Sequence, residues 1–313
     1  MKVKSDLFLT LVALATIFFT ASAPAAHAQR RKRPAPAPTA STKSITVTTE
    51  AGAIVWLDEV RRGLADATGK LTITNVSSGK HALRVRATGF KESTVQLTAA
   101  RRGDILVKLT RTTDEAELTF QQAEAAREKA RDDEARKAAA ALYQRALELR
   151  PRYPAARVGL ARVLLDLNDY KSALTQIDEA REARPVYPEA SAVEGRILRE
   201  NADTLGAIEA FERAIREARG FQPEAHTGLA LALEDKGRNE EAVNEFRKAI
   251  AQLSDTEPVI YQLLGALYEK MENYKEAVAA YDKFLQLAPE SNLAPAVRSV
   301  LDQLRRQAAE SPQ

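Results

Sequence analysis

The sequence predicts a multidomain fold: a small all-β antiparallel sandwich followed by an all-α solenoid of stacked helical hairpins. Short alternating apolar stretches, separated by turn glycines, occupy residues 44–111. Beyond residue 114, alanines recur with a period of 34 or 35 residues, and such a period is typical of helical-hairpin solenoids. The 313 residues include no cysteine, so both parts must fold on their apolar cores alone.

The first 28 residues have the pattern of a secretory signal peptide. Lys2 and Lys4 precede an apolar run at residues 7–20, and small residues follow as far as Ala28. The run is shorter than the roughly 20 residues that cross a bilayer as a helix. We therefore expect cleavage before Gln29 and an exported chain, periplasmic or at the cell surface. The alternative is an uncleaved membrane anchor, because positive charges directly after the run tend to stay cytoplasmic.

Residues 29–43 are expected to form a basic, Pro/Ala-rich linker, because alternating proline and alanine favours an extended chain. The linker begins with Arg30, Arg31, Lys32 and Arg33, which could attract an anionic envelope polymer or simply be solvated. Residues 29–111 contain 16 Lys/Arg against 6 Asp/Glu, whereas residues 112–313 contain 28 against 36. An acidic repeat array in an exported chain argues against a nucleic-acid partner.

Within residues 44–111, two segments resemble the PEGA domain, a small β module of prokaryotic surface proteins. They are GAIVWLDEVRRG, residues 52–63, and SGKHALRVRATGF, residues 78–90. The chain departs from that family at Glu50-Ala51, where the name-giving Pro-Glu would stand, and at Glu59 in place of a glycine. We expect these changes to alter turns and to leave the sandwich intact. The resemblance implies a bacterial protein of the cell surface.

Two side chains of the predicted sandwich could bind a ligand. Trp56 lies next to Leu57 in a predicted strand, so one of the two must face outward. An outward Trp56 could stack on a sugar ring, or it could cover the core or the junction with the solenoid. His81 has no Cys, second His or paired carboxylate near it in the sequence, so we expect a structural role for it.

The helical repeat is defined by a small residue followed four positions later by a large apolar one. The pairs are Ala139 and Tyr143, Ala173 and Ile177, Ala207 and Phe211, Ala242 and Phe246, and Ala277 and Tyr281. Twelve residues before each of the last four alanines stands another small residue: Ala161, Gly195, Ala230 and Gly265. These small residues allow the two helices of a hairpin to approach closely, and the large ones fill the gap to the next hairpin.

The repeat segments at residues 160–185 and 265–289, LARVLLDLNDYKSALTQIDEAREARP and GALYEKMENYKEAVAAYDKFLQLAP, resemble tetratricopeptide repeats. The resemblance implies about five repeats over residues 114–290. The first should be a cap, because Arg127 replaces a small crossing residue. Residues 291–309 predict an amphipathic capping helix whose apolar face is Leu293, Val297, Val300, Leu301 and Leu304. Phe284, where other repeats have alanine, should fill space beneath that helix or push it outward.

The same resemblance implies that first-helix residues line a concave groove. The candidates for partner binding are Arg162, Leu165, Arg196, Arg199, Leu231, Glu234, Gln262 and Glu269. The three arginines could grip an acidic peptide through bidentate hydrogen bonds. Alternatively, they pair with Asp166, Glu194 or Glu200 and bind nothing else.

The chain shows no motif of catalysis. It has no glycine-rich phosphate loop, no His-Glu-x-x-His and no serine between elbow glycines. We therefore expect no enzymatic activity, cofactor or metal. The sequence predicts a protein–protein interaction scaffold of the bacterial cell envelope that binds a partner segment in the groove. The alternative is a cell-wall or surface-glycan-binding module that uses the sandwich, with the solenoid as a spacer or a self-association surface.

Overall fold

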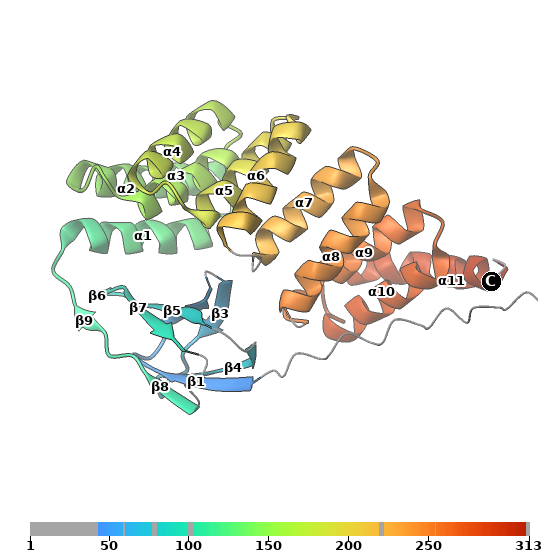
Figure 1. The fold of residues 1–313 in the computed structure, drawn as a ribbon, viewed down its shortest axis with the longest axis horizontal. Helices are drawn as coiled ribbons and strands as arrows, with labels where there is room; N and C mark the ends of the chain where they lie inside the picture. Colours follow the sequence, from blue (N-terminus) through green and yellow to red (C-terminus); the bar gives the residue numbers. More distant parts are fainter. Residues whose placement is uncertain are drawn as a thin grey trace, which may run out of the picture. The chain divides into compact units, whose positions relative to one another are not determined.

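The computed structural model describes residues 43–58, 60–76, 80–98, 103–218, 222–253 and 255–310. The predicted signal peptide and the basic cluster at residues 30–33 lie outside the described residues. Within these ranges, nine strands come first and eleven helices follow (Figure 1). The predicted fold class, a small β region followed by a helical solenoid, is confirmed.

The strands form two main sheets. One has the order β4-β1-β8, made of Lys70–Val76, Lys43–Thr48 and Gly103–Leu106. The other has the order β3-β2-β5-β7, made of Val60–Leu64, Ile54–Leu57, His81–Arg86 and Ser93–Leu97. Two short strands, β6 (Phe90–Lys91) and β9 (Thr110–Arg111), pair with each other. These pairings are antiparallel except β1 with β8, which is parallel.

Alternation along β2 and β5 places one face of their sheet in the apolar core. Val55, Leu57, Leu83 and Val85 are buried there against the other sheet. Trp56 points to the opposite face, as period-two alternation requires. At the end of β2, Asp58 adopts a left-handed φ of 52°. Its carboxylate accepts a hydrogen bond from Ala82 N at 2.8 Å and lies 2.5 Å from the Nδ1 atom of His81. His81 therefore contacts the turn at the end of β2.

The eleven helices pack as five hairpins and one terminal helix. Their bounds are α1 Glu115–Lys129, α2 Asp133–Leu149, α3 Pro154–Asp166, α4 Tyr170–Ala183, α5 Pro188–Glu200, α6 Thr204–Glu217, α7 Pro223–Asp235, α8 Asn239–Leu253, α9 Val259–Lys270, α10 Tyr274–Leu287 and α11 Ala294–Glu310. Aspartates cap the N-termini of α1, α2, α4 and α6 by accepting backbone N–H bonds. A proline is the first residue of α3, α5 and α7. The backbone N–H at this position has no partner within a helix, so its absence in proline costs nothing.

The small and large residues of the repeat pack as predicted. A Cβ atom added to Gly195 would lie 2.7 Å from the Phe211 ring, and one added to Gly265 would lie 2.7 Å from the Tyr281 ring. The other side of Phe211 meets the next repeat, because a Cβ atom at Gly228 would lie 2.3 Å from the same ring. The Phe211 ring therefore joins its own hairpin to the following one.

The predicted capping helix is α11, and Phe284 fills the space beneath it. Phe284 is buried in one cluster with Val297, Leu301 and Leu304. Leu293 was expected on the same apolar face, but it precedes the helix and is 37% exposed. The prediction for Leu293 was wrong because α11 begins one residue later, at Ala294.

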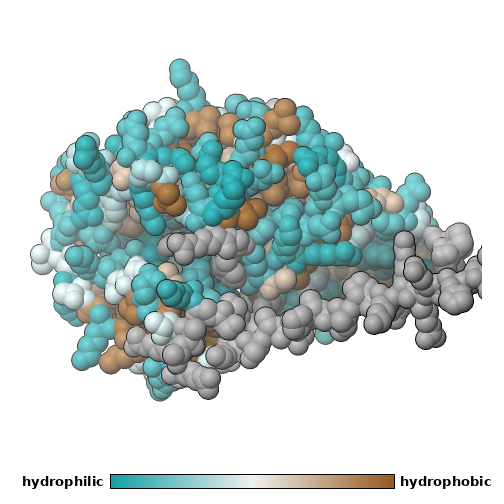
Figure 2. Space-filling model, in the orientation of Figure 1, coloured by the Kyte–Doolittle hydropathy of each residue, from teal (hydrophilic) through white to brown (hydrophobic). Residues whose placement is uncertain are grey.

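The surface carries no large apolar face in the part of the chain that is described. Its most exposed large apolar side chains, Leu64, Leu106, Val186 and Leu205, belong to separate parts of the chain. Figure 2 shows hydrophilic side chains over most of the visible face, with apolar ones in small separate patches. Scattered apolar side chains of this kind are ordinary. None of the described helices is long and apolar enough to span a bilayer.

Candidate functional site

The first helix of the solenoid holds the sandwich through one side-chain amide. Gln121 of α1 accepts a hydrogen bond from Gly89 N at 2.9 Å and donates one to Phe90 O at 2.8 Å. Gly89 has a φ of 82°, a left-handed conformation that favours glycine. The Gln121 amide is oriented by Glu117, to which it donates a second bond at 3.0 Å. We call these contacts the Gln121 clamp.

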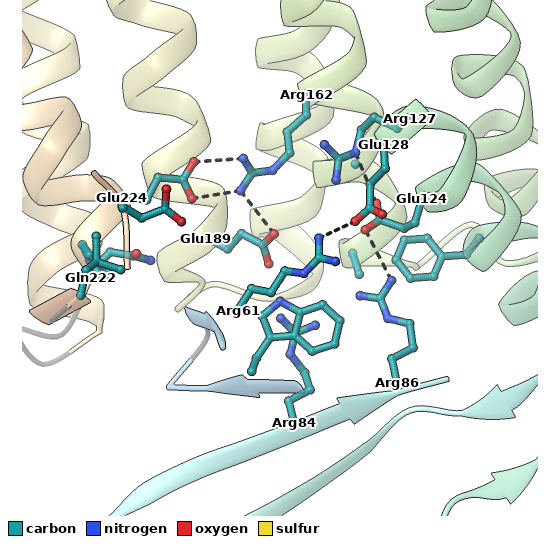
Figure 3. Close-up of a pocket in the computed structure, with 17 residues that line it drawn as sticks. Arg61, Arg84, Arg86, Glu124, Arg127, Glu128, Arg162, Glu189, Gln222 and Glu224 are labelled. Carbon is teal, nitrogen blue, oxygen red and sulfur yellow. Dashed lines mark hydrogen bonds and ion pairs between the residues drawn. The ribbon is translucent and has the colours of Figure 1, made fainter. Parts of the chain in front are cut away.

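Ion pairs continue the contact between the sandwich and α1. Arg86 of β5 lies 3.4 Å from Glu124, and Arg61 of β3 lies 2.8 Å from Glu128 (Figure 3). Burial alone would raise the pKa of the Glu124 carboxyl, but the charges of Arg127 and Arg86 hold that pKa below its ordinary value. Glu124 is therefore a partly buried, ionised carboxylate between the two parts of the chain.

Beyond these ion pairs lies a pocket of about 360 Å³. The sandwich and the first helices of successive hairpins form its walls (Figure 3). The residues that line it are Trp56, Arg61, Arg84, Arg86, Phe120, Glu124, Arg127, Glu128, Ala155, Gly159, Arg162, Glu189, Gln222, Pro223, Glu224, Leu253 and Glu257. Five arginines and five glutamates are among them, so the pocket can bind polar groups of either sign.

Trp56 lies in this pocket, at the junction with the solenoid. The guanidinium carbons of Arg84 and Arg86 lie 4.3 Å and 4.9 Å from the centre of its ring. Both distances are within the range of cation–π interaction. Trp56 thus faces outward from its sheet and lies at the junction with the solenoid.

The groove arginines are paired with carboxylates. Arg162 donates to both oxygens of Glu224, at 3.0 Å and 3.2 Å, and lies 3.4 Å from Glu189. Burial would lower the pKa of the Arg162 guanidinium, but these two carboxylates raise it above its ordinary value. Arg196 lies 3.8 Å from Glu224.

Arg199 pairs in the same way. It lies 2.7 Å from Asp235 and 3.4 Å from Glu200. Of the three acidic partners suggested by the sequence, only Glu200 is used by a groove arginine; Glu194 instead pairs with Arg213. Most of the carboxylates that pair with the groove arginines belong to later repeats. The residues next to each arginine in the sequence do not indicate such pairs.

The remaining candidates for partner binding differ in their burial and in their contacts. Leu165 is 5% exposed and packs inside its hairpin with Ala173 and Ile177, so it is not available to a partner. Leu231 is partly buried against a core cluster that its own hairpin shares with the hairpins before and after it. Glu234 pairs with Lys270 at 3.2 Å. Glu269 accepts a hydrogen bond from the Tyr281 hydroxyl at 3.0 Å, and Gln262 is half-buried.

Sequence reasoning missed the polar residues that α5, α7 and the connections bring to the pocket: Glu189, Gln222, Glu224 and Glu257. Glu189 and Glu224 follow the first prolines of α5 and α7, 35 residues apart. A Pro-Glu pair repeated at the same position of two repeats was the available signal. Gln222 and Glu257 lie between helices, where the repeat pattern specifies nothing.

The arrangement contains groups for binding and no recognisable centre for metal chemistry. Among the described residues, no group of three His, Cys, Asp or Glu side chains could hold a metal ion. The pocket is a concave space lined by side chains that can form hydrogen bonds, as is typical of ligand-binding sites.

Comparisons with known proteins identify the helical part. Three family models described as "Tetratricopeptide repeat" match residues 130–197, 192–258 and 258–291. No curated protein sequence matches the chain significantly.

Two solved structures are similar in fold. A thermophilic TPR protein from Thermus thermophilus is 22% identical, with a TM-score of 0.51 over 61% of this chain and 99% of that one. The pilF protein of Pseudomonas aeruginosa is 18% identical, with a TM-score of 0.52 over 62% of this chain and 87% of that one. At these identities, the likeness concerns the fold alone.

Proposed function

Because residues 130–291 of this chain are tetratricopeptide repeats, we propose that it is a non-enzymatic scaffold that binds a segment of another protein in its concave groove. The observation that carries this proposal is the pocket of about 360 Å³ lined by α1, α3, α5 and α7. A pocket of this size lies in the range that accommodates ligand groups. A partner segment that follows the groove would place a side chain in it.

The sandwich would take part in this recognition. Arg61, Arg84 and Trp56 form one wall of the pocket, so a partner would contact both parts of the chain at once. Once the partner has bound one part of the chain, the other part is held close to it, which raises the effective concentration of the second contact. The glycan-binding alternative has less support, because Arg84 and Arg86 already stack on the Trp56 ring that would receive a sugar.

We further propose that the protein is exported to a bacterial cell envelope. The support is the signal-peptide pattern of residues 1–28 and the PEGA-like segments of residues 52–63 and 78–90. The basic cluster at residues 30–33 would then add a contact to anionic polymers. N-terminal sequencing of the protein recovered from its own cells tests the proposal, with Gln29 as the expected first residue. A chain that still begins at Met1 would contradict cleavage.

Filling the pocket tests the scaffold function. Ala155 lines the pocket and is half-buried, so Ala155→Trp should occupy the space without removing a charge. Ala296→Trp is the matched control, because Ala296 is exposed on α11. Affinity capture from an extract of the source cells should recover a partner with the unaltered chain and with the control but not with Ala155→Trp. Identical captures by all three would contradict a role for the pocket.

A further inference from the structure

The pocket contains a glutamine side chain whose amide is free to bind a ligand. Gln222 is only 4% exposed, and it lines the pocket with its side chain directed into it (Figure 3). Its side-chain amide has no hydrogen-bond partner within the described parts of the chain. The amide atoms are open to the space of the pocket. A ligand in the pocket can therefore form hydrogen bonds with Gln222 without displacing a protein group.

The charges of the pocket indicate the sign of that ligand. The solenoid contributes Glu124, Glu128, Glu189, Glu224 and Glu257 against Arg127 and Arg162. This wall therefore has three more carboxylates than guanidinium groups. The sandwich adds Arg61, Arg84 and Arg86, which bring the lining to five arginines and five glutamates. Arg61 pairs with Glu128 and Arg86 with Glu124, whereas Arg84 pairs with Glu92 outside the pocket.

Of the five glutamates that line the pocket, Glu257 is the one without an ion pair among the described residues. Arg162 divides its contacts between Glu189 and Glu224. Glu257, which is exposed just before α9, makes no ion pair within the residues that the structure describes. A carboxylate ligand would meet these acidic groups and would have to displace Glu224 from Arg162. A cation can instead pair with the Glu257 carboxylate, which no described arginine or lysine occupies.

We propose that the pocket binds an arginine side chain presented by the partner segment; this rests on the proposed function. A guanidinium group has five N–H donors in one plane, so it can donate to the carboxylates of Glu257 and Glu189 and to the Gln222 carbonyl together. The Gln222 NH₂ group can then donate to a backbone carbonyl of the same segment. A lysine ammonium is a compact point charge and spans these acceptors less well. The groove therefore selects basic segments.

A displayed library of random heptapeptides, selected on the unaltered full chain, tests this ligand class. Each recovered peptide is then assayed on the Ala155→Trp chain to find those that need the pocket. Arginine should be common to the pocket-dependent peptides. Replacing it by citrulline, which keeps the shape and removes the charge, should weaken binding about tenfold or more, as expected for a charge-assisted hydrogen bond.

Two variants locate the contact. Glu257→Gln should weaken an arginine peptide about tenfold and leave its citrulline form unchanged. Gln222→Leu should weaken both forms. Glu276→Gln is the matched control, because Glu276 is exposed on α10 and lies outside the pocket, and it should change neither. Since Glu257 is also exposed, its variant keeps the folded structure.

The outcomes separate this inference from the proposed function. Pocket-dependent peptides that are acidic or uncharged would overturn the arginine assignment and leave the scaffold function standing. Pocket-dependent arginine peptides that bind Glu257→Gln as well as the unaltered chain would also overturn it. A library with no peptide that depends on the pocket would overturn both.

Discussion

Glu124 joins three parts of the protein through one carboxylate. It lies 3.4 Å from Arg86 of the sandwich and 3.7 Å from Arg127 on its own helix, and it accepts a hydrogen bond from the Tyr143 hydroxyl of α2. Burial, followed by the charge of Glu124, raises the pKa of Tyr143 well above its ordinary value. Tyr143 therefore remains a neutral donor, and Glu124 remains its ionised acceptor.

Glu124 should make the stability of the protein depend on pH. Its pKa lies below the ordinary 4.5 in the folded state, so folding favours the ionised form. The stability that it contributes is present above that pH and is lost as the pH falls through the lower folded value. Glu124→Gln should therefore unfold more easily at neutral pH and lose less stability on acidification. Urea unfolding from neutral pH to about pH 3 measures this, with Glu276→Gln as the control. Parallel pH profiles for all three chains would contradict the role of Glu124.

At the scale of helices, the solenoid depends on rings that pack between glycines of neighbouring hairpins. Phe211 is fully buried and meets Gly195 on one side and Gly228 on the other. Because the next repeat supplies one of these glycines, neither hairpin encloses the ring alone. Stability is then shared between neighbours, as expected for a repeat array.

Gly228→Ala tests this packing. In an ordinary helix interior the change would stabilise the fold by about 0.5–1 kcal/mol. Here the new Cβ atom would lie 2.3 Å from the Phe211 ring, so the variant should lose about 1–3 kcal/mol of unfolding free energy. Chemical denaturation followed by circular dichroism measures the difference. A variant as stable as the original chain would show that the ring moves freely.

The helical elements were predictable because their packing repeats along the chain. Ala207 and Phe211 recur with equivalents in every hairpin, and that pattern specifies both the helices and their crossings. The pocket was not predictable to the same degree. Arg162 pairs with Glu224, 62 residues away, and such a pairing leaves no local pattern. Gln222 lies in a connection, where side-chain direction depends on the whole array.

At the scale of the whole molecule, the Gln121 clamp connects the two parts of the chain. Sequence composition predicted the sandwich and the solenoid separately, and Trp56 was one candidate for their junction, but nothing in the sequence indicated the contact of Gln121 with Gly89 and Phe90. Gln121 and Gly89 are 32 residues apart and belong to different periodic patterns. The clamp depends on one amide that hydrogen-bonds to two partly buried backbone groups, Gly89 N and Phe90 O. Loss of the amide would leave both groups without this partner.

Breaking the clamp should loosen the junction between the sandwich and α1. In limited proteolysis of the unaltered chain, we expect the first cut in the predicted linker at residues 29–44 and not at residues 111–119. Gln121→Leu should make residues 111–119 an early cutting site, because Gly89 N and Phe90 O lose their partner. Gln144→Leu is the control, since Gln144 is exposed on α2. Mass spectrometry of the fragments identifies the sites. Early cutting at residues 111–119 in the unaltered chain would mean that the clamp does not hold.

The parallel pairing of β1 with β8 determines how the sandwich would respond to mechanical force. β1 is the central strand of its sheet and the first strand of the described chain, and β8 lies beside it in the same direction. A pull on the N-terminal end of β1 against the C-terminal end of β8 slides the two strands past each other. The evenly spaced hydrogen bonds of a parallel pair then bear the load together, so they do not open one after another as in a zipper. If the N-terminal end of the chain were fixed to a surface, its attachment would resist extension through this pair of strands.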